Sequence, residues 1–123
     1  MKLKIFLLIF IIYSCTKQNI DNTCSDQYYK GKLVLKGICM NYVIEIIEGQ
    51  INPDLIESEW INEFNNKKYN NVFALESVCS FPENLNEEDE FKFIINNTIE
   101  MKCAVCLAYS PTPKKSLKIE ICK

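Results

Sequence analysis

The sequence predicts an all-β domain that is mainly antiparallel and cross-linked by disulfides, in the form of a small barrel or sandwich. Short segments in which apolar and polar residues alternate recur along the chain, and this alternation is typical of half-buried strands. Longer segments with apolar residues at helical spacing are rare. Seven cysteines in 123 residues add a candidate disulfide framework, which small secreted domains use to supplement a limited core.

Five segments carry the strand signal. We expect strands at 31–36 (GKLVLK), 41–48 (NYVIEIIE), 71–77 (NVFALES), 90–96 (EFKFIIN) and 117–122 (LKIEIC). The segment Gly37-Ile38-Cys39-Met40 suits a turn or bulge between the first two, and Ser80-Phe81-Pro82 ends the third. A count of five to seven short strands fits a small barrel or sandwich, and it also fits a five-stranded OB-like barrel.

Residues 52–64 are compatible with two structures. In the first, Asn52 caps a helix with Pro53 at its first position. The broad apolar face of that helix would carry Leu55, Ile56, Trp60, Ile61 and Phe64. In the second, a strand through Trp60 turns at Asn65-Asn66 and returns from Tyr69. We favour this hairpin, because asparagine tolerates the left-handed backbone that a tight turn requires.

The start of the chain indicates an export signal. Lys2 and Lys4 precede the apolar run 5–12, and a signal peptide needs a positive start followed by about 7–15 apolar residues. The run is too short for a membrane-spanning helix, which takes about 20 apolar residues. Ile12-Tyr13-Ser14-Cys15 resembles a lipobox, from which Tyr13 departs where a small or aliphatic residue is usual.

The lipobox resemblance implies a processed, membrane-attached protein. Residues 1–14 would form the signal peptide, and Cys15 would be the acylated residue left at the new amino end. A polar tether would then occupy 15–27 and a single β-domain 28–123. Two or more acyl chains hold a protein stably on a membrane, so the membrane is an expected partner through this anchor.

The other six cysteines predict up to three disulfides. They are Cys24, Cys39, Cys79, Cys103, Cys106 and Cys122. Cys24 and Cys122 bracket the domain, so we predict that they pair and that the remaining four form two further bridges. Two alternatives stay open for those four: a reduced, four-thiol metal site, or redox exchange by the Cys103-Ala104-Val105-Cys106 motif. We favour structural disulfides and predict neither a cofactor nor a metal.

Composition excludes several classes of function. The chain has 14 lysines, no arginine, no histidine and a formal charge of -2, whereas nucleic-acid binding needs a clustered basic face. Histidine, the commonest general acid or base, is absent. No GxSxG or SxxK motif and no phosphate-binding glycine loop occurs. We therefore expect a protein that is not an enzyme and does not bind nucleic acid.

Three further features are candidate sites. The loop with Tyr109, Pro111, Pro113, Lys114 and Lys115 is a possible recognition loop, stiffened by its prolines. Glu83 to Glu90 (ENLNEEDE) is rich in carboxylates, but it lacks the pattern of a calcium loop, so we interpret it as a solvated turn leading into a strand. The aromatic residues Trp60, Phe64, Tyr69 and Phe73 could form an exposed patch for a ligand, but we assign them to the core, because a domain of this size needs its aromatic residues there.

The chain as a whole resembles small lipoproteins of Bacteroidota. The resemblance depends on the lipobox-like start, the polar tether and the stretches LKGICMNYVIEI, NVFALESVCSFP and CAVCLAYSPTP. It implies a lipid-anchored protein of the bacterial cell envelope, and we expect a binding or structural role with a protein or glycan partner. Two alternatives are a thiol redox or metal-binding envelope protein that uses Cys103 and Cys106, and an inhibitor or immunity lipoprotein.

Overall fold

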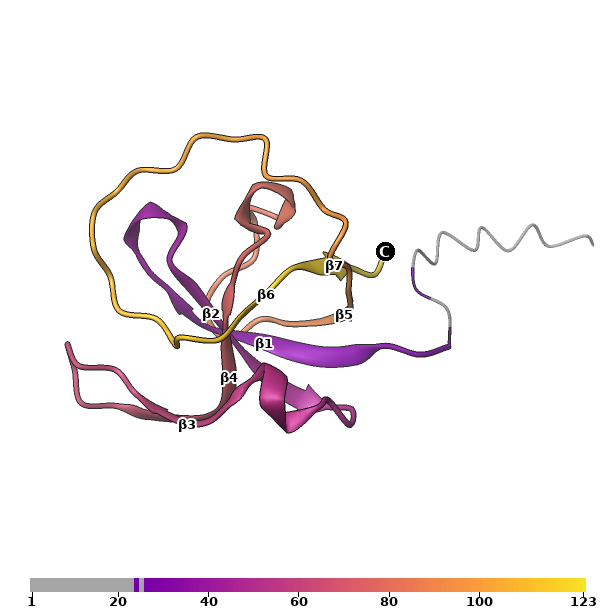
Figure 1. Cartoon of the computed structure of the whole chain (residues 1–123), viewed down its shortest axis with the longest axis horizontal. Coiled ribbons are helices and arrows are strands. Elements are labelled where there is room, and N and C mark those ends of the chain that lie inside the picture. The colour runs from indigo at the N-terminus through magenta and orange to yellow at the C-terminus, as the bar shows by residue number, and fades with distance from the viewer. Residues whose placement is uncertain (1–23, 25) are drawn as a thin grey trace, which may run out of the picture.

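The computed structural model describes residue 24 and residues 26–123 (Figure 1). Its seven strands are β1 (Tyr29–Lys36), β2 (Tyr42–Glu48), β3 (Glu57–Ile61), β4 (Lys68–Leu75), β5 (Glu90–Ile95), β6 (Ser116–Leu117) and β7 (Ile119–Ile121). Three 3-10 turns lie between strands: η1 (Ile38–Met40), η2 (Pro53–Leu55) and η3 (Val78–Ser80). The predicted signal peptide and the predicted lipidation site, Cys15, lie outside the described residues.

The strands form one all-β sheet in the order β3-β4-β2-β1-β5-β7, with β6 pairing β4. All ladders are antiparallel except β4 with β6. Only Lys118 separates β6 from β7, so the same short segment borders β4 on one side and β5 on the other. The neighbours β1-β2-β4-β6/β7-β5-β1 therefore follow one another around an open-sided barrel. This is the strand order of an OB-type barrel, to which β3 is added as a further strand.

Consecutive residues of the strands face two different apolar clusters. Leu33, Ile44 and Phe73 belong to the inner core together with Phe93, and all four are fully buried. Their neighbours Val34, Val43 and Val72 form a second cluster with Tyr69, against which Trp60 packs. Because side chains alternate across a strand, the second cluster lies on the outer face of the sheet.

The structure confirms the favoured hairpin within residues 52–64. The side chain of Asn52 caps the short η2 turn and Pro53 is its first residue, but the segment then continues as β3, not as a helix. β3 pairs with β4 from Glu57 opposite Val72 to Ile61 opposite Lys68. The turn is closed by Asn62, whose N–H donates to Lys67 O at 2.9 Å.

Two strand predictions need correction. The strand expected at 71–77 begins at Lys68, because its first residues pair with β3. The strand expected at 117–122 is divided into β6 and β7, since its hydrogen bonds change from β4 to β5 around Lys118. Leu117 and Ile119 are both buried, so the alternation that predicted this strand is present although the pairing partner changes.

Ser77 fastens β7 to the residues after β4. Its Oγ donates to Ile119 O at 3.0 Å and accepts from Ile119 N at 2.9 Å, in a fully buried position.

We expect Ser77→Ala to lower the free energy of unfolding by about 1–3 kcal/mol, because it leaves buried backbone groups unpaired. Urea denaturation measures this change. The exposed Ser116→Ala is the control, expected within about 0.5 kcal/mol of wild type; equal effects of the two would contradict this role of Ser77.

The predicted pairing of Cys24 with Cys122 is confirmed, with a Cα–Cα distance of 5.3 Å. Cys122 directly follows Ile121, the last residue of β7, and its N–H donates to Lys92 O of β5. The bridge therefore ties the start of the described domain to the strand pair that completes the ring.

The acidic run 83–90 forms the turn before β5, as predicted, and Lys36 Nζ donates to the carbonyls of Glu83 and Leu85 within it.

Candidate functional site

The candidate site is built on the long connection between β5 and β6, residues 96–115, which we call the β5–β6 loop. It runs as an arc around one side of the molecule (Figure 1) and contains no helix or strand. Loops longer than about 12–15 residues without secondary structure are uncommon, and they are usually either disordered or functional. The predicted recognition loop, from Tyr109 to Lys115, is the second part of this longer connection.

Two disulfides hold the middle of the loop. Cys103 pairs with Cys79 of η3, and Cys106 pairs with Cys39 of η1, with Cα–Cα distances of 5.6 and 5.1 Å. The two cysteines of the CxxC motif are thus bonded to different partners, as structural cross-links. Within the described part of the chain, no group of three or more Cys, Asp or Glu side chains is arranged to hold a metal ion.

Polar contacts fix the second part of the loop. Asn41 Nδ2 donates to Ala108 O at 3.4 Å, and the Tyr109 hydroxyl donates to the Glu63 carboxylate. Lys115 Nζ donates to Ile56 O at 3.2 Å, while Lys115 O accepts from Ala74 N at 2.9 Å. From Cys103 onward the loop is therefore attached in turn to η3, η1, the β3–β4 hairpin and β4, so its shape is set by the rest of the domain.

The residues of the predicted recognition loop have different roles. Tyr109 is 68% exposed, and Lys114 is also exposed. Pro111 and Pro113 are buried, and Pro111 borders the same cavity as Trp60, which packs on the outer cluster. Lys115 is used as an anchor. Only Tyr109 and Lys114 thus present exposed side chains, and the prolines position them.

Tyr109 is oriented although it is exposed. The hydrogen bond to Glu63 raises the pKa of the Tyr109 phenol, with smaller contributions from desolvation and from the Glu63 charge. The ring also meets Phe64 edge-to-face, with centroids 5.9 Å apart. Phe64 itself is 67% exposed, so its assignment to the core was wrong, whereas that of Tyr69 and Phe73 is confirmed. Phe64 lies outside the core because it sits in the hairpin turn.

Four exposed apolar residues lie on η1 and in the middle of the β5–β6 loop, the two segments that the Cys39–Cys106 bridge joins. Ile38 is 62% exposed, Leu107 98%, Val105 41% and Met101 39%. We call these four residues the apolar face. Sequence analysis missed it because these residues lie in irregular segments, where no alternation separates buried from exposed positions.

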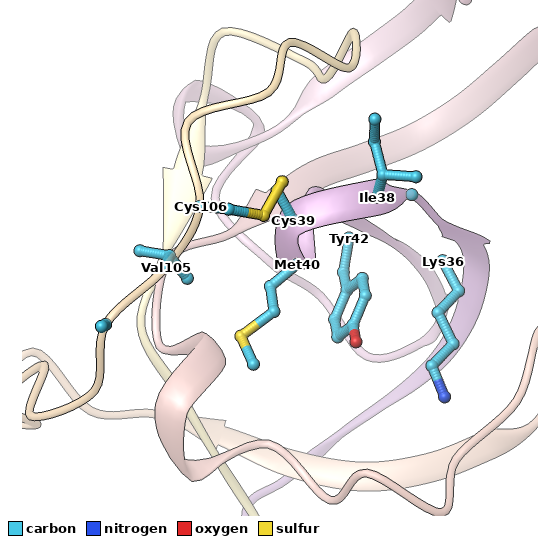
Figure 2. A pocket seen from close by; sticks show the side chains of 9 residues that line it. Lys36, Ile38, Cys39, Met40, Tyr42, Val105 and Cys106 are labelled. Atoms are coloured by element: carbon cyan, nitrogen blue, oxygen red, sulfur yellow. A yellow bond between two sulfur atoms is a disulfide. The ribbon is translucent and has the colours of Figure 1, made fainter.

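A cavity of about 510 Å³ opens beside the bridge, lined on one side by η1 and on the other by Ala104, Val105 and Cys106. Figure 2 shows Met40 and Tyr42 pointing to one side of η1 and Ile38 to the other. Lys36 also borders the cavity, but its Nζ is bound to the carbonyls of the 83–90 turn. The cavity is thus bordered mainly by apolar side chains, which can pack against a bound group but provide few hydrogen bonds or charges to it.

The backbone of η1 is held in an unfavourable conformation. Cys39 and Met40 have φ values of 55° and 58°, a left-handed region that costs a residue other than glycine about 1–2 kcal/mol. Gly37 N donates to Asn41 O at 3.1 Å and Asn41 N to Ile38 O at 3.2 Å, and the bridge to Cys106 adds a covalent restraint. Such conformations persist where the surroundings enforce them, often at functional sites.

Fold and site together define a disulfide-linked, all-β domain of OB-type strand order that displays an apolar face on a fixed loop. In this strand order η1 lies in the connection between β1 and β2, and the β5–β6 loop is the connection that precedes β6. Comparison with protein-family models, curated proteins and solved structures found no match. Within residues 24 and 26–123, no helix is long and apolar enough to cross a membrane.

Proposed function

We propose that this chain is a lipid-anchored, non-enzymatic binding protein of the bacterial cell envelope, and that it engages a protein partner through the apolar face. The observation that carries the proposal is that Leu107 is almost fully exposed on a loop fixed by two disulfides. An exposed apolar side chain on a rigid support loses little conformational entropy when a partner covers it.

The chemistry of the face favours a protein over a glycan. Ile38, Val105 and Leu107 are aliphatic and offer no hydrogen-bond donor or acceptor in their side chains, whereas sugar hydroxyls require both. Contiguous exposed apolar surface is typical of protein interaction sites. The lipid anchor at Cys15 is supported by the lipobox-like start of the sequence, and it would place the face close to envelope proteins.

Site-specific photo-crosslinking in intact cells tests the proposal. A photoreactive residue at position 107 is expected to give one predominant protein adduct. The same residue at Ser58, an exposed position on β3, is the control and should not give it. In a chain with a photoreactive residue at position 105, Leu107→Asp should reduce the adduct at least tenfold, because burying an unpaired charge at an interface costs several kcal/mol.

Two results would reject the proposal: no adduct from position 107, or the same adducts from both positions. The anchor is measured separately, by the intact mass of the protein extracted from membranes. Diacylglyceryl and acyl groups on Cys15 are expected, and an unmodified Cys15 thiol would rule out the lipid anchor while leaving the crosslinking result independent.

A further inference from the structure

A second cavity, of about 390 Å³, lies between β3 and the end of the β5–β6 loop. The β3 side contributes Glu57, Trp60 and Glu63, and the loop contributes Tyr109, Thr112 and Lys114. It shares no lining residue with the cavity of Figure 2. This second cavity is therefore a separate feature, and it does not depend on the apolar face.

Two aromatic rings are held in position at this cavity. Trp60 stacks on Tyr69 with ring centroids 5.5 Å apart and an interplanar angle of 29°, so one ring face is used by the outer cluster. Tyr109 is held by Glu63 and by the edge-to-face contact with Phe64. Both rings are thus supported by neighbouring residues, although both border an open cavity.

Polar side chains of complementary kinds line the same space. No side-chain hydrogen bond or ion pair joins Glu57, Thr112 or Lys114 to another described residue, although Glu57 pairs with Val72 through the backbone ladder. The acceptors, Glu57 and Glu63, come from the β3 side, and the ammonium donor, Lys114, comes from the loop. A ligand with groups that both donate and accept would satisfy the two sides at once.

We propose that this cavity binds a saccharide. A sugar hydroxyl donates to a carboxylate and accepts from an ammonium group, which matches Glu57 and Lys114. The C–H face of a pyranose ring is apolar and packs against an aromatic ring such as Trp60. The volume is near the lower end of the range for small-ligand sites, about 300–1,000 Å³, which suits one or two sugar rings.

The chain contains one tryptophan, Trp60, so tryptophan fluorescence reports on the surroundings of this one residue, which borders the cavity. The test uses the oxidised full chain, titrated to millimolar concentration with trisaccharides of N-acetylglucosamine, of glucose and of galactose. At least one is expected to shift Trp60 emission saturably. Glu57→Gln and Tyr109→Ala should each weaken that Kd at least tenfold, since the first removes the charge of the accepting carboxylate and the second removes an aromatic ring that lines the cavity.

Matched controls are available outside the cavity. Glu59→Gln changes a β3 carboxylate that pairs with Lys68 at 3.0 Å and does not line the cavity, and Tyr28→Ala removes another exposed tyrosine. Both should keep the parent Kd. The proposal is overturned if no trisaccharide shifts the emission, or if Glu57→Gln and Tyr109→Ala bind as tightly as these controls. Leu107→Asp should leave the saccharide Kd unchanged, so this test and the crosslinking test can fail separately.

Discussion

Replacing both Cys24 and Cys122 by serine is expected to lower the free energy of unfolding by about 3.5–4 kcal/mol. The bridge joins residues 98 positions apart, but the Cys39–Cys106 bridge lies inside that span. The loop that Cys24–Cys122 closes therefore contains only residues 24–39 and 106–122, and the stabilisation from a cross-link increases with the length of the loop that it closes. A domain of this size has about 5–15 kcal/mol of stability in total, so the variant should lose a large part of it. Urea denaturation of the oxidised proteins measures the change.

The bridge between Cys79 and Cys103 provides the internal comparison. It spans 24 positions with no other bridged cysteine inside them, and the same chain-entropy relation predicts a loss of about 3.5 kcal/mol for its double serine variant. The two double variants are therefore expected to lose amounts within about 0.5 kcal/mol of each other. A difference of more than about 1 kcal/mol would show that strain or residual structure outweighs chain entropy in this domain.

Phe93→Ala should be the most destabilising single substitution of those considered, at about 3–5 kcal/mol. Phe93 is fully buried, and its ring lies within 6.0 Å, centroid to centroid, of the rings of Tyr29, Phe73 and Phe91. Truncation leaves a cavity between β1, β4 and β5 that the surrounding rings fill only partly. Thermal or urea unfolding of the purified variant provides the measurement.

Phe64→Ala is the same chemical change at a position that is 67% exposed. It loses the edge-to-face contact with Tyr109, which corresponds to about 0.5–1.5 kcal/mol. Similar losses for the two variants would contradict the assignment of Phe93 to the centre of the core and of Phe64 to the surface.

The fold class could be predicted because successive side chains of a strand face opposite sides of the sheet, most clearly in β5, where Phe91 and Phe93 are buried and the residues before each are exposed. Leu33 beside Val34 and Phe73 beside Val72 face opposite sides of the sheet, and such segments are recognisable one at a time. The hairpin at β3 and β4 could also be predicted, from the asparagines of its turn. The pairing of Cys24 with Cys122 followed from their positions at the two ends of the domain.

Other features depend on contacts between distant residues. The division of the last strand around Lys118 depends on which strands lie on either side of it, and no local pattern encodes that. The partners of Cys103 and Cys106 are set by where η3 and η1 meet the loop. The exposure of Ile38 and Leu107 likewise results from this arrangement. Because both residues lie in irregular segments, the sequence pattern did not show that they are exposed.

The position of β6 and β7 in the sheet determines when the sheet can be completed. These strands link β4 to β5, yet they are the most C-terminal of the described strands. In the proposed export to the envelope, β1 to β5 would emerge first, and β4 and β5 would stay unjoined until β6 and β7 arrive. The sheet would then be completed only after nearly all of the described chain has been translocated. Aggregation during such export would consequently depend on how quickly the C-terminal segment arrives.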